Sequence, residues 1–386
     1  MDDRPGPEPR PRPRILFVIN SIGSGGAERA LGRILDAAGD RRDRYEMHLA
    51  LLDREPEMRA LPMLDGRHRL DARGGLLRSV VQLRRLLRRL RPVLVVSLLV
   101  RANMATALAA PAAGARAVLC ERMHLSSHLA GRYRGAKLRA LRLLARRLYR
   151  RADLMLAVSE GVRRDLVERF GVPAGRVLTI ENPYDVDRIV AEGARAPSIA
   201  LPPAFIVAVG RLVAAKGFAL LIDAYARADP PLPLVVLGEG PDRARFEARA
   251  AAAGLAERIR FAGFVADPFA VMARAAFLVS ASHNEGFPNA IAEAMALGVP
   301  VIATDCPSGP AELLGAGAGA PGEVVEAPFG LVVRDGDAGG LAEAIGRMAD
   351  PGLRARLSAA GRRRIEDFRA ERIAERYWAA FDRFAS

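Results

Sequence analysis

The chain has 386 residues, a formal net charge of +14 and two cysteines. This length exceeds what one hydrophobic core usually organises, so at least two domains are expected. With 51% apolar residues, the composition excludes a disordered, collagen-like or disulfide-built protein. Cys120 and Cys306 lie far apart and lack metal-ligand spacing, which indicates two core thiols in a reducing compartment.

The start of the chain is polar and rich in proline, and the first apolar run begins at Ile15. This pattern predicts a disordered tail over residues 1–13 and not a signal peptide. No apolar run reaches the roughly 18–20 residues that a membrane-spanning helix needs. We therefore expect a cytoplasmic protein, either free in solution or bound peripherally to the inner face of the cytoplasmic membrane.

The positive charge is concentrated in the first half of the sequence. Residues 1–185 contain 36 Lys and Arg against 20 Asp and Glu, a net charge of +16, whereas residues 186–386 contain 22 against 24, a net charge of −2. This asymmetry predicts an anionic partner for the first half. Only Lys137 and Lys216 are lysines, so the arginine excess also reflects a compositional bias, which weakens the argument for a partner.

The first half of the chain reads as short apolar strands that alternate with helical patterns. A strand at Ile15–Asn20 is followed by the glycine-rich loop SIGSGG and by a helix with an apolar face. Two basic amphipathic helices are predicted at Leu76–Leu90 and Leu138–Tyr149. Further strands are expected at Met47–Leu52, Val93–Leu98, Ala117–Cys120, Leu154–Val158 and Val177–Ile180.

The alternation restarts after a hinge that is predicted at Glu181–Tyr184, where Pro183 keeps Asn182 out of helical geometry. The final part, Leu353–Phe384, has a helical pattern almost throughout. Between these segments, strands are predicted at Phe205–Gly210, Leu234–Gly238, Arg258–Phe261, Phe277–Ser280, Val299–Ala303 and Leu331–Val333.

Strands that alternate with helices indicate parallel sheets with right-handed crossovers. We therefore expect an α/β protein of two facing Rossmann-like domains, an N-terminal one over residues 14–183 and a C-terminal one over residues 184–365. A C-terminal helix over residues 366–386 is expected to pack back on the N-terminal domain. Open parallel sheets bind ligands beyond the carboxyl ends of their strands, so the loops along the interdomain cleft should carry the functional residues.

The loop after the predicted strand Phe205–Gly210 contains Arg211, and Lys216 follows at the start of the next helix. Gly210 permits a tight turn, and the two cations can converge on a helix N-terminus whose N–H groups are free. Such a combination suits a diphosphate. Taken alone, this loop is explained better as an ordinary solvated start of a helix.

The strand Phe277–Ser280 leads into the segment EGFPNAIAE, which runs from Glu285 to Glu293. Pro288 is placed as the first helical residue, so that Glu285 lies in the loop and Glu293 in the second helical turn. Two carboxylates in these positions could accept hydrogen bonds from two sets of hydroxyls, as a sugar and a ribose require. An acid at a helix start and an exposed helix residue explain the two glutamates equally well.

Five motifs occur in order over about residues 205–335: VGRLVAAKG, LVVLGEGPDR, RIRFAGFV, SASHNEGFPNAIAEAMALGVPVIATD and PSGPAELL. Together with SIGSGGAER near the N-terminus, they resemble the retaining glycosyltransferases of family 4, which have the GT-B fold. The resemblance extends over nearly the whole chain. It implies transfer of a sugar from a nucleotide sugar, by family frequency a UDP-sugar, to a glycan or lipid-linked acceptor in cell-surface polysaccharide or glycoconjugate biosynthesis.

The resemblance also implies roles for individual residues. Arg211 and Lys216 would bind the donor diphosphate and neutralise the charge of the leaving nucleoside diphosphate. Glu285 would contact hydroxyls of the transferred sugar, and Glu293 would accept hydrogen bonds from the ribose. The other residues expected at the donor are Gly25, Gly26, Gly210, Phe264, Phe287, Pro288 and Asn289.

His124 follows the predicted strand Ala117–Cys120, where the family often places a histidine that faces the sugar. It would stabilise the positive charge that develops on the sugar or hold a hydroxyl, and the alternative is a surface histidine. His128 is the weaker candidate for a functional role of these two histidines. His48 and His68 are interpreted as residues without a role in the site.

The resemblance implies a mechanism as well. The leaving phosphate would take the acceptor's proton on the same face of the sugar, which retains the anomeric configuration. Closure of the two domains would exclude water and suppress hydrolysis. Because the basic residues and helix N-termini would address the charge on the diphosphate, no metal ion and no other cofactor are expected.

The acceptor is expected at the N-terminal domain, which carries nearly all of the excess charge. Basic helices with leucine stripes, around Arg84–Arg91 and Arg139–Arg151, could lie on an anionic bilayer surface and so reach a lipid-linked acceptor. The alternative is that the leucines face the core and the arginines are simply solvated.

Two further classes of protein remain as alternatives to a transferase. A sugar-nucleotide epimerase or a phosphorylase would share two facing Rossmann-like domains, although the EGFPNAIAEAMA and GSGGAER patterns favour a transferase. The charge also suggests a non-enzymatic nucleic-acid binder. The chain has only six Tyr and one Trp and shows no interleaving of basic and aromatic residues, so no nucleic-acid partner is expected.

Overall fold

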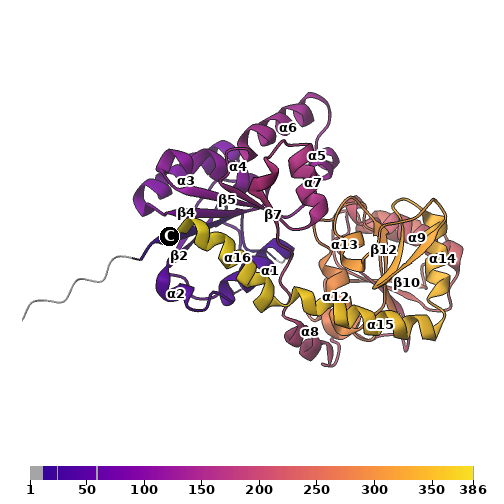
Figure 1. Cartoon of the computed structure of the whole chain (residues 1–386). Coiled ribbons are helices and arrows are strands. Elements are labelled where there is room, and N and C mark those ends of the chain that lie inside the picture. Colours follow the sequence, from indigo (N-terminus) through magenta and orange to yellow (C-terminus); the bar gives the residue numbers. More distant parts are fainter. Residues whose placement is uncertain (1–11, 24, 58–59, 386) are drawn as a thin grey trace, which may run out of the picture.

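The structure is a computed structural model that describes residues 12–23, 25–57 and 60–385. Each half of the chain forms a seven-stranded sheet that is packed between helices (Figure 1). The prediction of an α/β protein with two Rossmann-like domains is therefore confirmed. Residues 1–11 of the predicted disordered tail lie outside the described residues.

The first sheet is entirely parallel and has the strand order β3-β2-β1-β4-β5-β6-β7. Its central strands are runs of buried apolar residues, because both faces of the sheet are covered. The chain reverses its direction of progress between β1 and β4, and such a reversal places a ligand site at the carboxyl ends of the strands. The strands are β1 (Arg14–Ile19), β2 (Glu46–Leu51), β3 (Gly66–Arg69), β4 (Leu94–Leu98), β5 (Arg116–Glu121), β6 (Leu154–Ala157) and β7 (Val177–Thr179).

The helices of the first half follow the predicted amphipathic patterns. The helix expected at Leu76–Leu90 has these bounds in the structure, and its apolar face is buried while its arginines lie outside. The second basic helix begins slightly earlier than expected, at Gly135. The helices are α1 (Gly26–Asp36), α2 (Arg41–Arg44), α3 (Leu76–Leu90), α4 (Val100–Ala109), α5 (Leu125–Arg132), α6 (Gly135–Tyr149) and α7 (Glu160–Glu168).

The second sheet has the order β10-β9-β8-β11-β12-β14-β13. All its strands are parallel except β13, which pairs antiparallel with β14 at one edge. The predicted strand Phe277–Ser280 has these bounds as β11. The other strands are β8 (Ile206–Val209), β9 (Leu234–Leu237), β10 (Ile259–Gly263), β12 (Val301–Asp305), β13 (Val324–Ala327) and β14 (Gly330–Arg334).

Short helices connect the strands of the second sheet. Most follow a parallel strand and return the chain to the next one, as the alternation in the sequence predicts. They are α8 (Val186–Gly193), α9 (Phe218–Ala228), α10 (Arg243–Ala252), α11 (Pro268–Met272), α12 (Asn289–Leu297), α13 (Pro310–Leu314), α14 (Ala338–Arg347) and α15 (Pro351–Ile365).

Two edge strands have no counterpart among the predicted elements. The strand β3 has the sequence GRHR, which contains no aliphatic residue, and its side chains alternate between half-buried and exposed. Its extended shape comes from parallel pairing with β2. The strand β13 follows a glycine-rich loop and pairs with β14. Tertiary pairing thus makes β3 extended where local propensity is weak.

The chain crosses between the two domains twice, and the crossings bond to each other. The backbone N–H of Tyr184 in the first crossing donates to the Phe368 carbonyl at 2.9 Å. The Ala370 N–H of the second crossing donates to the Tyr184 carbonyl at 2.7 Å. We propose that these crossings mark the boundary between the N-terminal and C-terminal domains.

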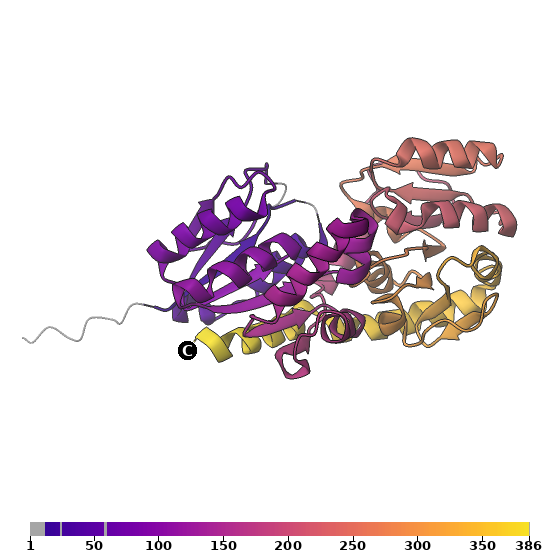
Figure 2. The ribbon, with the colours of Figure 1, turned by 90° about the horizontal axis from the view of Figure 1, so that it is seen from above.

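The last helix, α16 (Ala370–Ala385), returns to the first domain and lies against it in both views (Figures 1 and 2). The indole N–H of Trp378 donates to the Ile34 carbonyl at 2.8 Å. Its ring meets Phe17 of β1 edge-on at a centroid distance of 6.0 Å and Phe381 at 5.5 Å. The end of the chain is therefore part of the core that its beginning forms.

Replacing Trp378 by alanine tests how much the packing of α16 on the first domain contributes to stability. A fully buried tryptophan leaves a large cavity when truncated, so Trp378→Ala should lower the free energy of unfolding by about 3–5 kcal/mol. Urea denaturation followed by circular dichroism measures the change, because Trp378 is the sole tryptophan. The exposed Glu371 on the same helix supplies the control, Glu371→Ala, which should change stability by less than about 0.5 kcal/mol. Equal effects of the two variants would contradict the assignment of α16 to the core.

Candidate functional site

The loops at the carboxyl ends of both sheets surround one cleft, which holds a cavity of about 710 Å³. From the first domain, its walls include the loop between β1 and α1, the start of α4 and the end of β5. From the second domain, the walls come from the loops after β8 and β11. The cavity thus lies where the topology of the two sheets predicts a ligand site.

On the side of the second domain, Lys216 and Glu285 form an ion pair. The Lys216 ammonium donates to Oε1 of Glu285 at 2.5 Å, and the Ser282 hydroxyl donates to the same oxygen at 2.7 Å. Arg211 lines the cavity beside them. Gly217 has a φ of +65°, and a Cβ there would lie 1.7 Å from the Ala281 carbonyl oxygen, so glycine is required to bring the two loops together.

The segment from Gly286 to Asn289 is where the second domain touches the first most closely. A Cβ at Gly286 would lie 1.9 Å from the carbonyl oxygen of Arg122. The Asn289 amide oxygen accepts hydrogen bonds from the Asn182 amide at 2.9 Å and from the Tyr184 hydroxyl at 2.7 Å. These bonds fix the N-terminus of α12 relative to the hinge.

Two details of this segment differ from the sequence prediction. The helix α12 begins at Asn289, and Pro288 precedes it with a φ of −81° and a ψ of 87°, so Pro288 caps the helix and is not its first residue. The ring of Phe287 is buried against one aromatic residue from each interdomain crossing. Its centroid lies 6.4 Å from that of Tyr184 and 5.5 Å from that of Phe368. Phe287 also lines the cleft.

Glu293 lies behind the cleft wall and not on its surface. It is 4% exposed, and Nη1 of Arg29 on α1 donates to its Oε1 at 2.7 Å. The predicted position in the second turn of the helix is correct. The carboxylate therefore joins the two domains through an ion pair in this structure.

The glycine-rich loop before α1 faces the segment that contains Glu285. Gly25 and Gly26 line the cavity, and a Cβ at Gly26 would lie 2.3 Å from Nδ2 of Asn289. The absence of a side chain at Gly26 thus lets the loop approach the second domain closely. Gly210 packs against the aliphatic stem of Lys216.

Phe264 follows β10 and is 65% exposed. Its side chain is not among the residues that line the described cavity. The structure therefore brings Gly25, Gly26, Arg211, Lys216, Glu285, Phe287 and Asn289 together around the cavity and leaves Gly210, Phe264, Pro288, Glu293 and His124 outside its lining.

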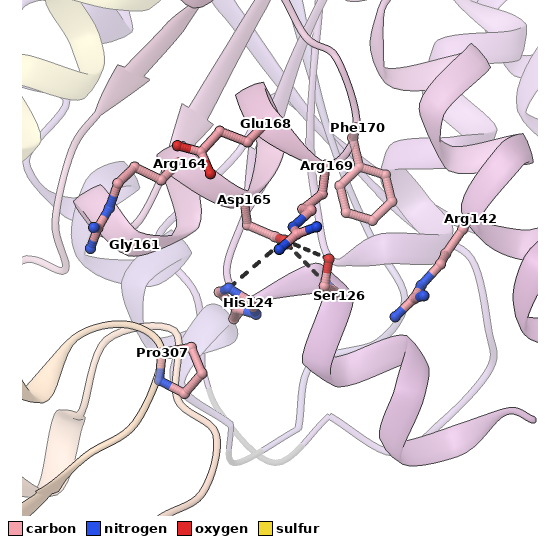
Figure 3. Close-up of a pocket in the computed structure, with 10 residues that line it drawn as sticks. All are labelled: His124, Ser126, Arg142, Gly161, Arg164, Asp165, Glu168, Arg169, Phe170 and Pro307. Carbon is pink, nitrogen blue, oxygen red and sulfur yellow. Dashed lines mark hydrogen bonds and ion pairs between the residues drawn. The ribbon is translucent and has the colours of Figure 1, made fainter. Parts of the chain in front are cut away.

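His124 does not line the cleft in this structure, so its role at the sugar stays a prediction. His124 is the N-terminal cap of α5, and its Nδ1 accepts from the backbone N–H of Ser127. The imidazole ring that caps the helix points into a separate pocket beside Asp165 (Figure 3). His128, one turn further along α5, lines the cleft instead, and burial followed by the charge of Arg132 lowers its pKa to about 4.

Glu121 and Arg122, at the carboxyl end of β5, also line the cleft and were not predicted as site residues. Arg122 donates to the Tyr377 hydroxyl at 2.6 Å and to the Asn182 side chain, so it ties the cleft to α16 and the hinge. Glu121 is fully buried and accepts from the Tyr149 hydroxyl at 2.7 Å. Their position at a strand end is the one signal in the sequence that could have identified them.

The described residues contain no group of three His, Cys, Asp or Glu side chains that could hold a metal ion. The chain has two Asp-x-Asp strings, and all four of these aspartates bond to other groups of the protein. Asp185 and Asp337 cap helices, Asp187 pairs with Arg369, and Asp335 pairs with His283. Among the same residues, no helix is long and apolar enough to span a membrane.

Two facing parallel sheets with a cleft between their carboxyl ends define the GT-B class of fold, and solved structures agree. HepE of Anabaena in complex with UDP superposes with a TM-score of 0.72 at 22% identity, and the alignment covers 96% of this chain and 99% of that one. The sucrose-phosphate synthase of Thermosynechococcus elongatus gives a TM-score of 0.77 at 20% identity, with the same coverage. These likenesses concern the fold alone.

Two family descriptions match consecutive parts of the chain. Residues 24–188 match Glycosyltransferase Family 4, and residues 193–364 match Glycosyl transferases group 1. The chain therefore belongs to the group 1 glycosyltransferases of family 4, as the resemblance of its motifs predicted.

Curated relatives match over part of their length. The N-acetylgalactosamine-N,N'-diacetylbacillosaminyl-diphospho-undecaprenol 4-alpha-N-acetylgalactosaminyltransferase of Campylobacter jejuni is 39% identical over 168 residues, 44% of this chain and 46% of that protein. The lipopolysaccharide core biosynthesis glycosyltransferase LpsE of Rhizobium meliloti is 35% identical over 174 residues, 45% of this chain and 48% of that protein. The match thus spans less than half the length of each of these relatives.

The buried carboxyl of Glu121 predicts a particular dependence of stability on pH. Burial raises its pKa from 4.5 to about 7. The folded chain therefore keeps a proton that the unfolded chain releases between these values, and the contribution of Glu121 to stability is lost as the pH rises through this window. Replacing Glu121 by Gln should remove this loss, which amounts to about 3 kcal/mol at most.

The measurement is the free energy of unfolding in urea at pH 5 and at pH 7.5, for the wild type and for Glu121→Gln. The wild type should lose more stability than the variant between these two values. His128 contributes the opposite slope, because its pKa is lowered, but it is present in both proteins and cancels in the comparison. Equal pH dependence in the two proteins would show that Glu121 titrates normally.

Proposed function

We propose that the protein transfers a sugar from a nucleotide sugar to a glycan or lipid-linked acceptor in the synthesis of a cell-surface polysaccharide or glycoconjugate. The observation that carries this proposal is the convergence of Lys216, Glu285 and Arg211 with the Gly25-Gly26 loop around one interdomain cavity. A cationic cradle beside a carboxylate suits a diphosphate joined to a hydroxyl-rich sugar. The family and the relatives from C. jejuni and R. meliloti support transfer over epimerisation, phosphorolysis or nucleic-acid binding.

The donor would lie across the cleft with its diphosphate between the basic residues and the glycine loop. Arg211 and Lys216 bind the phosphates, and Gly25 and Gly26 let the backbone approach them without a side chain. Glu285 then accepts hydrogen bonds from hydroxyls of the sugar. Glu293 binds the ribose when Arg29 moves from its carboxylate, since the two are paired in the present structure.

The transferred sugar retains its anomeric configuration in this proposal. The bond between the anomeric carbon and the phosphate oxygen breaks, and the acceptor oxygen bonds to the same face of that carbon. The acceptor's proton moves to the leaving phosphate. Arg211 and Lys216 compensate the negative charge that develops on the diphosphate, so the proposal involves no metal ion. A uridine nucleotide is proposed because HepE, which shares the fold, has been solved with UDP.

Binding measurements on two variants separate the proposed roles at the donor. Lys216→Ala should weaken the binding of UDP and of a UDP-sugar about tenfold or more, because a charged hydrogen bond to the diphosphate is lost. Glu285→Gln should weaken only the UDP-sugar, because Glu285 contacts the sugar. Isothermal titration calorimetry after a screen of nucleotide sugars gives both affinities.

The matched control for Lys216 is Arg227, an exposed basic residue on α9, the helix that Gly217 begins. Arg227→Ala should leave both affinities unchanged. The proposed site is wrong if both site variants bind UDP and the UDP-sugar as the wild type does.

We further propose that the basic face of the first domain rests on an anionic membrane and so reaches a lipid-linked acceptor. The helices α3 and α6 both pack on α4, and their arginines face outward. Apolar residues are exposed among them, including Leu77 and Leu143. Of the leucines of α3, Leu83 and Leu87 are buried in the core and only Leu77 is exposed, so attraction of arginines to anionic lipids carries more of this proposal than insertion of leucines.

Vesicle binding tests the membrane proposal. Each basic residue near an anionic surface contributes about 1 kcal/mol, so the double variant Arg85→Ala, Arg88→Ala should reduce partitioning onto phosphatidylglycerol vesicles about 25-fold. The control is Arg227→Ala, Arg245→Ala, which removes the same charge from exposed positions of the second domain. Sedimentation with vesicles at physiological salt measures both. Equal partitioning of the two double variants, or none by the wild type, would refute the proposal.

A further inference from the structure

A second cavity, of about 640 Å³, is separate from the donor cleft, and Figure 3 shows its lining residues. It is lined by residues of α6 and α7, by the start of α5 and by Pro307, which follows β12 in the second domain. The cavity therefore sits at the junction of the two domains. None of its lining residues belongs to the lining of the donor cleft.

The cavity is lined by three arginines, Arg142 of α6 and Arg164 and Arg169 at α7. The described residues provide no carboxylate within ion-pair distance of any of these three guanidinium groups. In Figure 3, Arg142 and Arg169 extend toward Ser126 from opposite sides. Cations that line the same cavity repel each other, and an anion bound among them would relieve that repulsion.

Two carboxylates also line the cavity, and neither removes the positive character of the arginine cluster. Asp165 is buried at the floor, where it accepts from the Ser126 backbone N–H at 2.9 Å and from the Ser126 hydroxyl at 2.5 Å. Glu168 is directed away from Ser126 in Figure 3. The two acidic residues leave one excess positive charge among the five charged side chains that line the cavity.

His124 adds a neutral donor to the cavity. Its Nδ1 accepts from the Ser127 N–H, so its proton is on Nε2, which lies 3.8 Å from Oδ1 of Asp165. Burial lowers its pKa, Asp165 opposes this effect, and the nearby Arg164 and Arg169 reinforce it. The imidazole is therefore neutral at pH 7 and can donate from Nε2 to an anion in the cavity.

The second cavity and the donor cleft share a wall. The backbone from Arg122 to His124 passes from one to the other, and Gly286 packs against Arg122 from the second domain. The Pro307 side of the cavity is tied to the cleft through Ser308, whose hydroxyl donates to the Glu285 carbonyl at 2.6 Å. A molecule with its sugar in the cleft could thus place an attached group in the second cavity.

We propose that this cavity binds the phosphate or diphosphate group of the acceptor while the acceptor's reacting hydroxyl enters the cleft. Guanidinium groups bind phosphate oxygens through paired hydrogen bonds, which Arg142 and Arg169 can supply from opposite sides of Ser126. This inference rests on the proposed transferase function for the identity of the acceptor, and on the arginine cluster for the anion.

Calorimetric titration of inorganic pyrophosphate tests the anion site without knowledge of the acceptor. Arg142→Ala and Arg169→Ala should each weaken pyrophosphate binding about tenfold. The control Arg139→Ala removes the same charge from an exposed position of α6 that does not line the cavity, and it should have no effect. Lys216→Ala should leave the binding that depends on Arg142 and Arg169 intact, because Lys216 lines the donor cleft and not this cavity.

The outcomes separate this proposal from the proposed function. Pyrophosphate binding that is lost in Lys216→Ala and unchanged in Arg142→Ala would place the anion in the donor cleft and overturn the second site. If UDP and UDP-sugars fail to bind but pyrophosphate binding depends on Arg142, the transferase proposal fails while the anion site stands.

Phosphatidylglycerol vesicles distinguish the source of the phosphate. Loss of vesicle binding in Arg142→Ala, Arg169→Ala without loss of pyrophosphate binding would identify a lipid headgroup site and overturn the role in acceptor binding.

Discussion

The arrangement of the site depends on one backbone contact between the domains. Gly286 lies so close to the Arg122 carbonyl that any side chain at this position would collide with it. This contact sets the distance between the end of β5 and the loop after β11. Glu285 and Asn289, on either side of Gly286, are thereby held against the first domain, one beside Lys216 and the other bonded to the hinge. The cleft owes its shape to this contact more than to any single side chain.

The ion pair between Lys216 and Glu285 affects both the charge and the rigidity of the cleft. A carboxylate beside the diphosphate position would repel an incoming donor if it were free, and its ion pair with Lys216 removes much of that repulsion. In the proposed function, the same pair would hold both side chains in place before the donor binds, so less conformational entropy would be lost on binding. The site is thus preorganised on the side of the second domain, while Arg29 and Glu293 bridge to the first.

Much of the fold could be predicted from the sequence, because buried parallel strands are continuous apolar runs. The strand Phe277–Ser280 and the helix Leu76–Leu90 have the predicted bounds. Edge strands escaped prediction, because β3 is GRHR and only its pairing with β2 makes it extended. Strand ends and glycine loops likewise predicted that Lys216 and Glu285 lie at the cleft, where the structure has them, but they did not predict the direction in which a side chain points.

The histidines show why that direction matters. His124 and His128 stand four residues apart, and the resemblance favoured the first because the family often places a histidine at this strand end. In the structure, the Nδ1 atom of His124 caps α5, which turns its ring toward Asp165, while His128 reaches the cleft one helical turn later. Glu121 and Arg122 were missed for a related reason. Two buried titratable residues at the end of an apolar strand produce no periodic pattern in the sequence.

The return of α16 to the first domain has a consequence for the order in which the chain acquires its structure. Trp378 and Phe381 complete a core that is otherwise built from residues such as Phe17 near the start of the chain. During synthesis the first sheet can form early, but its apolar surface under α16 stays uncovered until the ribosome has made the whole second domain. In that interval the nascent first domain exposes a surface that a chaperone could bind. The two domains therefore reach their final packing together, although each has its own sheet.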